Sequence, residues 1–373
     1  MENKSGIKTE YERIYSLDFL RVISCVGICW LHYRLYLCPE GIFFGDRLIN
    51  EEDCGWELKF FVEVFFGISG YLSFHQIDRI KKKSMMFSEF FKRKLIRILP
   101  MLFMGTVLYE IMVAVMVTYG RLIRQDFSVP SLWAILSSCF GVQVGWGFVS
   151  CGINVESWFL NVLLLCFVFF YFCIWLSEKW NINESVLFGI MVMIGCTATS
   201  YSLPIPFFID QDGRGYEAFF AGLLLAGYIH RKGVNKKTGV VALTILIVYG
   251  VYHTFWPELL FFGKHHLMSL FVTPALIVLM EIPFMKRFFS WRGWGILGRI
   301  TFCTYIFHVS MIFAIFNLET RLNLSIDYAH EVMLFCFIML AFLFGAGTYF
   351  FVERPITRIL TGQKIIEKIS PKG

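Results

Sequence analysis

The chain has 373 residues, of which 57% are hydrophobic, 18% aromatic and only 17% charged. Apolar runs long enough to cross a bilayer recur from end to end, which excludes a soluble globular domain and indicates a polytopic membrane protein. The runs are too long for barrel strands and lack their alternation, so we expect an all-α bundle. In such a chain the net charge of +6 is an orientation signal and does not indicate nucleic-acid binding.

About ten transmembrane helices are predicted, with both termini in the cytoplasm. Lysine and arginine concentrate in segments that this topology places inside, above all 78–95, 231–238 and 353–373, as the positive-inside rule requires. The chain then divides into a cytoplasmic segment 1–16, a transmembrane domain 17–352 and a basic cytoplasmic tail 353–373. The expected helices cover residues 17–37, 57–77, 96–118, 155–176, 186–203, 216–230, 239–255, 266–282, 300–318 and 330–352.

Two prolines and one irregular segment set details of this topology. Pro100 suits the first turn of the third helix, and Pro355 is expected to end the last helix. The apolar part of segment 119–154 is broken by glycines, so three interpretations stay open for it: a re-entrant segment, an interfacial segment or a short outer helix.

Cysteine spacing argues against a metal centre. Most of the eleven cysteines lie in apolar runs, where a thiol behaves as a small hydrophobic group. No CxxC or Cys/His metal spacing occurs, so no metal is expected. Cys38 and Cys54 share one loop and can form a disulfide if that loop faces an oxidising space.

The first helix carries ionisable residues inside its apolar run, where such groups are costly and usually functional. Arg21 and His32 are eleven positions apart, which places them on nearly the same helix face and about 16 Å apart along the axis. Histidine can take a proton from a hydroxyl near neutral pH, so His32 is a candidate general base. The alternative is a histidine that only bonds a packing neighbour.

An acid and a small polar residue follow in the second helix. Glu63 is a candidate catalytic residue that either orients His32 or pairs with an arginine. Ser69, beside Gly70, is a candidate substrate contact, although close helix packing explains a Ser-Gly pair equally well.

A basic cluster precedes the third helix. Arg93, Lys94 and Arg97 are candidates for binding phosphate groups of a donor, because Lys94 and Arg97 share a helix face and guanidinium groups match phosphate oxygens. Arg21 is expected to add to this site. Membrane anchoring and lipid-headgroup contact are the alternative. Glu353, at the end of the last helix, is a further candidate for the substrate and donor site. It pairs with neighbours of Arg354 or with Arg97 and Arg21 on the same membrane face, or it belongs to a solvated helix end.

Further candidates come from the second half of the chain. Trp158 is a candidate substrate contact, with the aromatic belt of the membrane interface as the alternative. His308 lies one turn from Tyr305, and either residue can line a cavity or serve structural bonding. His265-His266 is treated as interfacial, and Glu217 has no evident partner in the sequence.

Six short segments in a fixed order resemble the integral-membrane acyltransferase 3 family of bacterial-type O-acyltransferases. The family's Arg-x10-His pattern falls on Arg21 and His32, and its acid before Phe-Phe, more often aspartate, falls on Glu63. Its Arg-x-x-Arg falls on Lys94 and Arg97, where lysine keeps the charge but loses the bidentate fork. The matching segments are SLDFLRVISCVGICWLHY, VEVFFGISGYL, FKRKLIRILP, SWFLNVLLL, TYIFHVSM and FVERP.

The resemblance also places the family's Glu-Arg-Pro on Glu353, Arg354 and Pro355. It implies a multi-pass enzyme of the plasma (inner) membrane that moves an acyl group, often acetyl, from cytoplasmic acyl-CoA to a hydroxyl of a cell-envelope glycan or lipid-linked sugar. Acyl-CoA is then a co-substrate, no cofactor is bound permanently, and the partners are the glycan or glycolipid acceptor and membrane lipids.

Three alternatives remain at this stage. The acyl group passes directly to the acceptor or through an acyl-histidine, and it is acetyl, succinyl or another acyl group. A protein of a different class, a transporter or exporter of a glycan or acylated small molecule, also suits many helices with buried charges.

Overall fold

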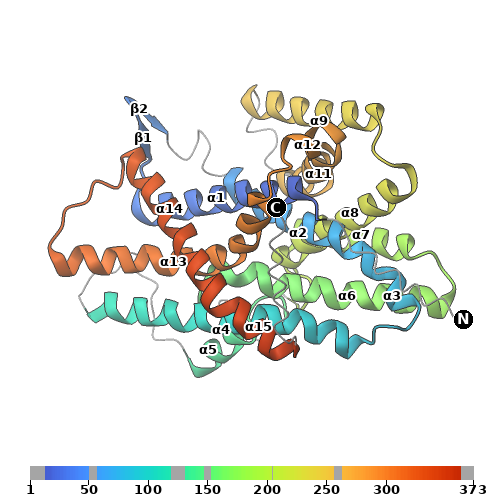
Figure 1. The fold of residues 1–373 in the computed structure, drawn as a ribbon, viewed down its shortest axis with the longest axis horizontal. Helices are drawn as coiled ribbons and strands as arrows, with labels where there is room; N and C mark the ends of the chain where they lie inside the picture. Colours follow the sequence, from blue (N-terminus) through green and yellow to red (C-terminus); the bar gives the residue numbers. More distant parts are fainter. Residues whose placement is uncertain are drawn as a thin grey trace, which may run out of the picture.

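The computed structural model describes residues 13–49, 57–118, 131–146, 153–203, 205–255 and 263–362, and these are mostly helical. The sheet in this described part is a small antiparallel hairpin of β1 (Ile42–Phe44) and β2 (Arg47–Ile49) (Figure 1). The longer helices are α1 (Tyr15–Leu37), α2 (Phe61–Ser73), α4 (Phe87–Thr118), α6 (Trp158–Trp180), α7 (Glu184–Tyr201), α8 (Asp210–Lys232), α9 (Lys236–Phe255), α11 (Thr273–Glu281), α13 (Gly293–Leu322) and α14 (Glu331–Thr348).

Short helical pieces extend or connect these helices. The short α-helices are α3 (Ile77–Lys81), α5 (Leu132–Cys139), α10 (Lys264–Leu267), α12 (Pro283–Phe288) and α15 (Arg354–Thr361). Single 3₁₀ turns occupy Glu57–Phe60, Phe74–Gln76 and Val155–Ser157, and π-helical turns occupy Met268–Val272 and Tyr349–Glu353.

Six helical stretches of the described chain are long and apolar enough to cross a membrane, which makes this a membrane protein of the helical type. The count of ten spans and the side on which the termini lie stay predictions. The six stretches are Phe87–Thr118, Trp158–Trp180, Glu184–Tyr201, Lys236–Phe255, Gly293–Leu322 and Glu331–Thr361.

The prediction for Pro100 was wrong. Helix α4 begins at Phe87, so Pro100 lies in the helix interior and not in its first turn. An interior proline lacks a donor and costs about 3 kcal/mol. The added N-terminal turns offset this cost by packing, because Phe90 is buried and the Phe87 ring lies 5.2 Å from the ring of Tyr171.

The prediction that Pro355 ends the last helix was also wrong. After α14 the helix widens into the π-helical turn Tyr349–Glu353 and then continues as α15. Pro355 stands in the first turn of α15, where a missing backbone N–H costs nothing. Because the helix continues, α15 adds Arg354 and Arg358 to the surface of the bundle instead of leaving them in a free tail.

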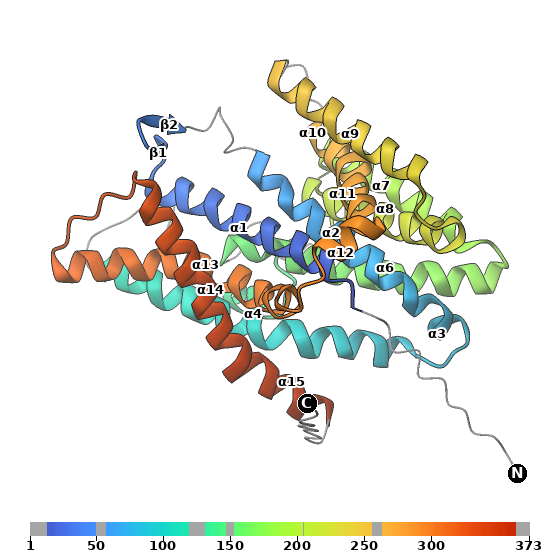
Figure 2. The ribbon, with the colours of Figure 1, turned by 45° about the horizontal axis from the view of Figure 1, so that its top comes forward.

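Helices α1 and α8 each pack against several other helices. Helix α1 contacts α2, α13 and α14, and α8 contacts α2, α6 and α7. Figure 2 shows α13 and α14 on one side of the bundle and α9 with α11 on the other. Helices α2 and α8 touch backbone to backbone, because a Cβ at Gly70 would overlap the carbonyl of Phe219 and one at Gly222 would overlap that of Gly67.

Two sequence predictions fall at the edge of the described chain. The described part of segment 119–154 includes the short helix α5, whose last turn is buried, next to α4. Cys54 lies outside the described residues. Its predicted partner Cys38 is a free thiol whose Sγ donates to the carbonyl of Tyr328 at 2.8 Å.

Candidate active site

A chain of buried polar side chains joins α1, α13 and the turn before α6. The Nε2 atom of His32 lies 2.7 Å from Oε2 of Glu156. The Nδ1 atom of His32 lies 2.9 Å from Nε2 of His308 and 3.1 Å from the carbonyl oxygen of Ile28. The Nδ1 atom of His308 lies 2.6 Å from the carbonyl oxygen of Tyr305. His32 and His308, two predicted site residues, are therefore direct neighbours.

The carbonyl partners determine where the ring hydrogens lie. A carbonyl oxygen only accepts, so Nδ1–H of His308 donates to Tyr305, and Nε2 of His308 is left as an acceptor. Nδ1–H of His32 then donates to His308 and to Ile28. The contact between Nε2 of His32 and the carboxyl of Glu156 therefore shares one further proton. A histidine and a carboxylate in this arrangement can hold or release one proton between them.

Two tyrosines fix Glu156 in place. The hydroxyl of Tyr36 donates to Oε1 of the carboxyl at 3.3 Å, and the hydroxyl of Tyr305 donates to the backbone carbonyl of Glu156 at 2.6 Å. Glu156 is not among the site residues that the sequence predicted. The available signal was an acid directly before an apolar helix, which does not identify the partner.

A cavity of about 320 Å³ lies beside this polar chain, between α1, α2, α4, α6 and α13. Three predicted cations line it, namely Arg21, Lys94 and Arg97, and so does Ser69. The ammonium of Lys94 lies 3.9 Å from the ring centre of Phe167. The structure thus brings together three residues predicted to bind the donor and one predicted to contact substrate.

Three aromatic rings lie at the other end of the same cavity. Phe65, Phe159 and Tyr305 all line it, and their ring centres lie 5.5 to 6.2 Å from one another. Tyr305 is also the residue that contacts Glu156 and His308. This aromatic trio therefore forms the wall between the cavity and the histidines.

A second cavity of about 580 Å³ adjoins the first, since Arg21 and Arg97 line both. Asp18 and Glu353 are its acids: Asp18 pairs with Arg21 at 3.3 Å, and Glu353 lies 3.8 Å from Arg97. The predicted pairing of Glu353 with Arg97 is thus present. The additional cations that line this second cavity are Arg13, Arg299, Arg354 and Arg358.

Two predicted donor-binding residues lie elsewhere. Arg93 pairs with Glu89 at 2.6 Å on the exposed side of α4, and it lines neither of these two cavities in the described chain. Trp158 packs against Phe66, and the guanidinium of Arg214 lies 4.8 Å from its ring centre. The roles of Arg93 and Trp158 in binding the donor stay predictions.

Glu63 contacts an arginine and not His32. Its Oε1 atom lies 2.7 Å from Nε of Arg214 and 3.1 Å from Nδ1 of His265, and its side chain is completely buried. The second of the two alternatives for Glu63 is therefore the one that the structure shows, while Glu156 is the acid on His32. Arg214 was missed because its partner lies 151 positions away on α2.

Replacing Glu63 with glutamine is expected to destabilise the protein by about 3–5 kcal/mol, because it leaves a buried guanidinium without its counter-charge. Thermal unfolding of the purified variant in detergent measures this loss. Replacing the half-buried Glu110 with glutamine is the matched control. An unchanged melting temperature for the Glu63 variant would show that the ion pair contributes nothing to stability.

A buried histidine–carboxylate pair beside a cation-lined cavity, in a helical membrane protein, is an arrangement suited to acid–base chemistry. The family model described as an acyltransferase domain, Acyl_transf_3, matches residues 14–350. The chain therefore belongs to the acyltransferase 3 family and is a membrane acyltransferase. No curated protein and no solved structure matches it significantly.

Proposed function

We propose that this protein transfers an acyl group, such as acetyl, from cytoplasmic acyl-CoA to a hydroxyl of a cell-envelope glycan or lipid-linked sugar. The observation that carries the proposal is the joined pair of cavities, which has cations at its entrance and the aromatic trio beside His32 and His308 at its inner end. Acyl-CoA is a long donor with phosphates at one end and a thioester at the other. Its phosphates match the cations of the entrance, and its thioester end matches the aromatic inner end.

The entrance suits the phosphates of the donor. Arg13, Arg299, Arg354 and Arg358 line the wider cavity, and Arg21 and Arg97 stand where the two cavities meet. Arginine presents several donors in a fork that matches phosphate oxygens. Two acids, Asp18 and Glu353, hold part of this charge in place, so the cations are positioned before the donor arrives.

The narrower cavity suits the pantetheine arm and thioester. It is lined largely by apolar side chains of α2, α6 and α13, with Ser69 as a polar contact. Its inner end is the aromatic trio, behind which Tyr305 contacts the backbone of Glu156. In this proposal the thioester carbonyl has to pass the aromatic trio to reach the buried histidine pair.

In the proposed reaction His32 is the general base. The reactive form is the pair without its shared proton, in which the acceptor hydroxyl takes the place of the Glu156 carboxyl at Nε2. As this hydroxyl gives its proton to Nε2, its oxygen attacks the thioester carbonyl carbon. The carbon–sulfur bond then breaks, and His32 returns the proton to the leaving thiolate. Glu156 stabilises the imidazolium that forms in between, and His308 keeps the ring oriented through Nδ1 of His32.

Replacing Arg97 with alanine is expected to raise the KM for acyl-CoA about 10-fold and to leave kcat nearly unchanged, because a guanidinium that binds phosphate far from the reacting atoms stabilises the ground state and the transition state equally. Steady-state transfer of a radiolabelled acyl group measures both constants. The matched control is Arg93→Ala, one turn earlier on α4, since Arg93 pairs with Glu89 outside both cavities. Equal constants for the Arg97 variant and the wild type would remove Arg97 from the donor site.

A transfer assay with the purified chain separates this function from transport. Labelled acetyl-CoA and candidate sugars are mixed with protein in detergent micelles, where no compartments exist. Labelled sugar ester formed under these conditions supports the enzyme. A chain that moves glycan across vesicles but forms no ester in micelles would be a transporter, the alternative class that helical bundles also serve.

A further inference from the structure

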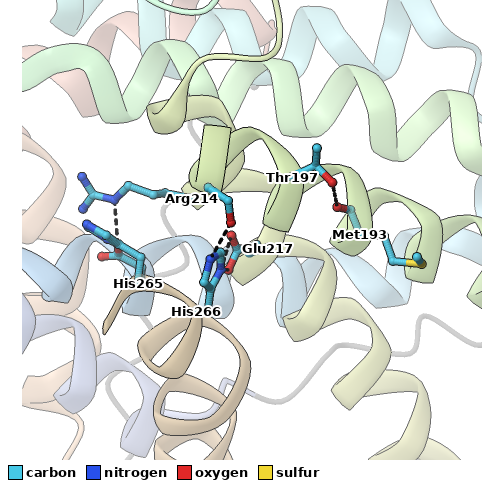
Figure 3. Close-up of polar contacts among 8 residues, drawn as sticks. Met193, Thr197, Arg214, Glu217, His265 and His266 are labelled. Carbon is cyan, nitrogen blue, oxygen red and sulfur yellow. Dashed lines mark hydrogen bonds and ion pairs between the residues drawn. The ribbon is translucent and has the colours of Figure 1, made fainter. Parts of the chain in front are cut away.

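A second group of polar residues lies where α7, α8 and α10 meet. Cys196 on α7, Glu217 on α8 and His266 on α10 each place one ligand atom within 4.8 Å of the other two. The Nδ1 atom of His266 lies 3.0 Å from both carboxyl oxygens of Glu217. Figure 3 shows these two side chains pointing toward each other from their helices.

Close helix packing brings Cys196 over Glu217. A Cβ at Gly195 would lie 2.8 Å from the backbone nitrogen of Glu217, and one at Gly213 would overlap the backbone of Thr199. Helices α7 and α8 therefore meet with their backbones in contact along this stretch. The third residue arrives from α10, directly before the π-helical turn Met268–Val272, a distortion that often marks functional sites.

Glu217 is completely buried, and among the described residues no lysine or arginine forms an ion pair with it. Arg214, one turn away, points to the other side (Figure 3), where it pairs with Glu63. A buried carboxylate needs a compensating positive charge or a proton, and a metal ion bound at this point would supply the charge.

We propose that Cys196, Glu217 and His266 bind a divalent transition-metal ion of the zinc class. Thiolate, carboxylate and imidazole together are the ligands that zinc accepts, and two anionic ligands neutralise the charge of the ion. The Nδ1 atom of His266 is the metal ligand, and its Nε2–H donates to Oγ of Ser200 at 3.1 Å, which fixes the ring and the tautomer.

Three protein ligands leave a fourth position for water. His266 and Cys196 are only partly buried in the described chain. Sequence spacing gave no sign of this site, because Glu217 and His266 are separated by 49 positions and come from different helices. The expectation of no metal rested on local Cys/His patterns, which such a site does not need.

The test uses the full-length chain purified in detergent without a polyhistidine tag, stripped with a chelator and titrated with Zn²⁺ against a fluorescent zinc indicator. One zinc ion per chain is expected. Cys196→Ser and His266→Ala are each expected to weaken binding at least about 100-fold, and Ser200→Ala about 10-fold, because outer partners of metal ligands contribute 10- to 100-fold. Cys336→Ser, which removes an exposed thiol of α14, is the matched control.

Absorption of bound Co²⁺ provides a second measurement, and the spectrum of the wild-type chain alone can contradict the proposal. Co²⁺ bound to the wild-type chain is expected to show thiolate-to-cobalt charge-transfer absorption, which disappears in Cys196→Ser and persists in Cys336→Ser. Size-exclusion elution reports whether each variant is folded. The proposal is overturned if the wild-type chain binds less than one zinc ion, if its cobalt complex lacks the thiolate band, or if a folded Cys196→Ser variant binds zinc with unchanged affinity.

Discussion

Replacing His32 with alanine is expected to lower the rate of acyl transfer by about 10²–10⁴-fold, the range that positioned acid–base groups contribute. The imidazole of His32 lies between Glu156 and His308, and alanine removes both ring nitrogens that these residues contact. Transfer of labelled acetyl from acetyl-CoA, measured with equal amounts of purified protein, gives the ratio of kcat values.

The control for this change is His230→Ala, because His230 is an exposed histidine in the last turn of α8. It is expected to retain wild-type turnover. The His32 variant must also insert and accumulate at normal levels, since a general base has no role in membrane insertion. Turnover close to the wild type in a well-folded His32→Ala protein would remove His32 from the reaction.

Replacing Glu156 with glutamine is expected to lower kcat by about 10²–10⁴-fold with little change in the KM for acyl-CoA. The amide keeps the size of the side chain but cannot balance an imidazolium, and changes of this kind in histidine–carboxylate pairs cost up to about 10⁴-fold. The KM is spared because Glu156 does not line the two cavities that the described chain encloses.

A double variant tests whether His32 and Glu156 act as one unit. If they share one proton, His32→Ala combined with Glu156→Gln is expected to be no slower than the worse single variant, because residues that act together are strongly non-additive. Glu110→Gln, at a half-buried acid of α4, serves as the control for the charge change. Fully multiplicative effects in the double variant would contradict a shared catalytic step.

The sequence predicted best where the chemistry lies along a single helix. Arg21 and His32 are related by three turns of α1, and Lys94 and Arg97 by one turn of α4, and helix geometry fixes such relations before folding. The structure accordingly places Arg21, Lys94 and Arg97 on one cavity and His32 at the buried pair beside it.

Prediction failed where a local rule competed with packing. Pro100 and Pro355 carry the usual signals for helix starts and stops, yet α4 begins well before Pro100, and Pro355 stands in the first turn of a further helix, α15. Buried aromatic contacts of Phe87 and Phe90 outweigh the missing backbone hydrogen bond in α4. Before Pro355, the π-helical turn Tyr349–Glu353 continues the helix from α14 into α15.

By itself, then, the sequence determined the membrane class, the approximate helix positions and the acyltransferase 3 resemblance, because hydropathy and short-range spacing are properties of contiguous residues. The tertiary structure alone decided that Glu156 and not Glu63 faces His32, that Arg214 neutralises Glu63, and that Cys196, Glu217 and His266 converge. Each of these relations joins residues of different helices. Helix packing sets the distance between such residues, and local periodicity carries no information about that packing.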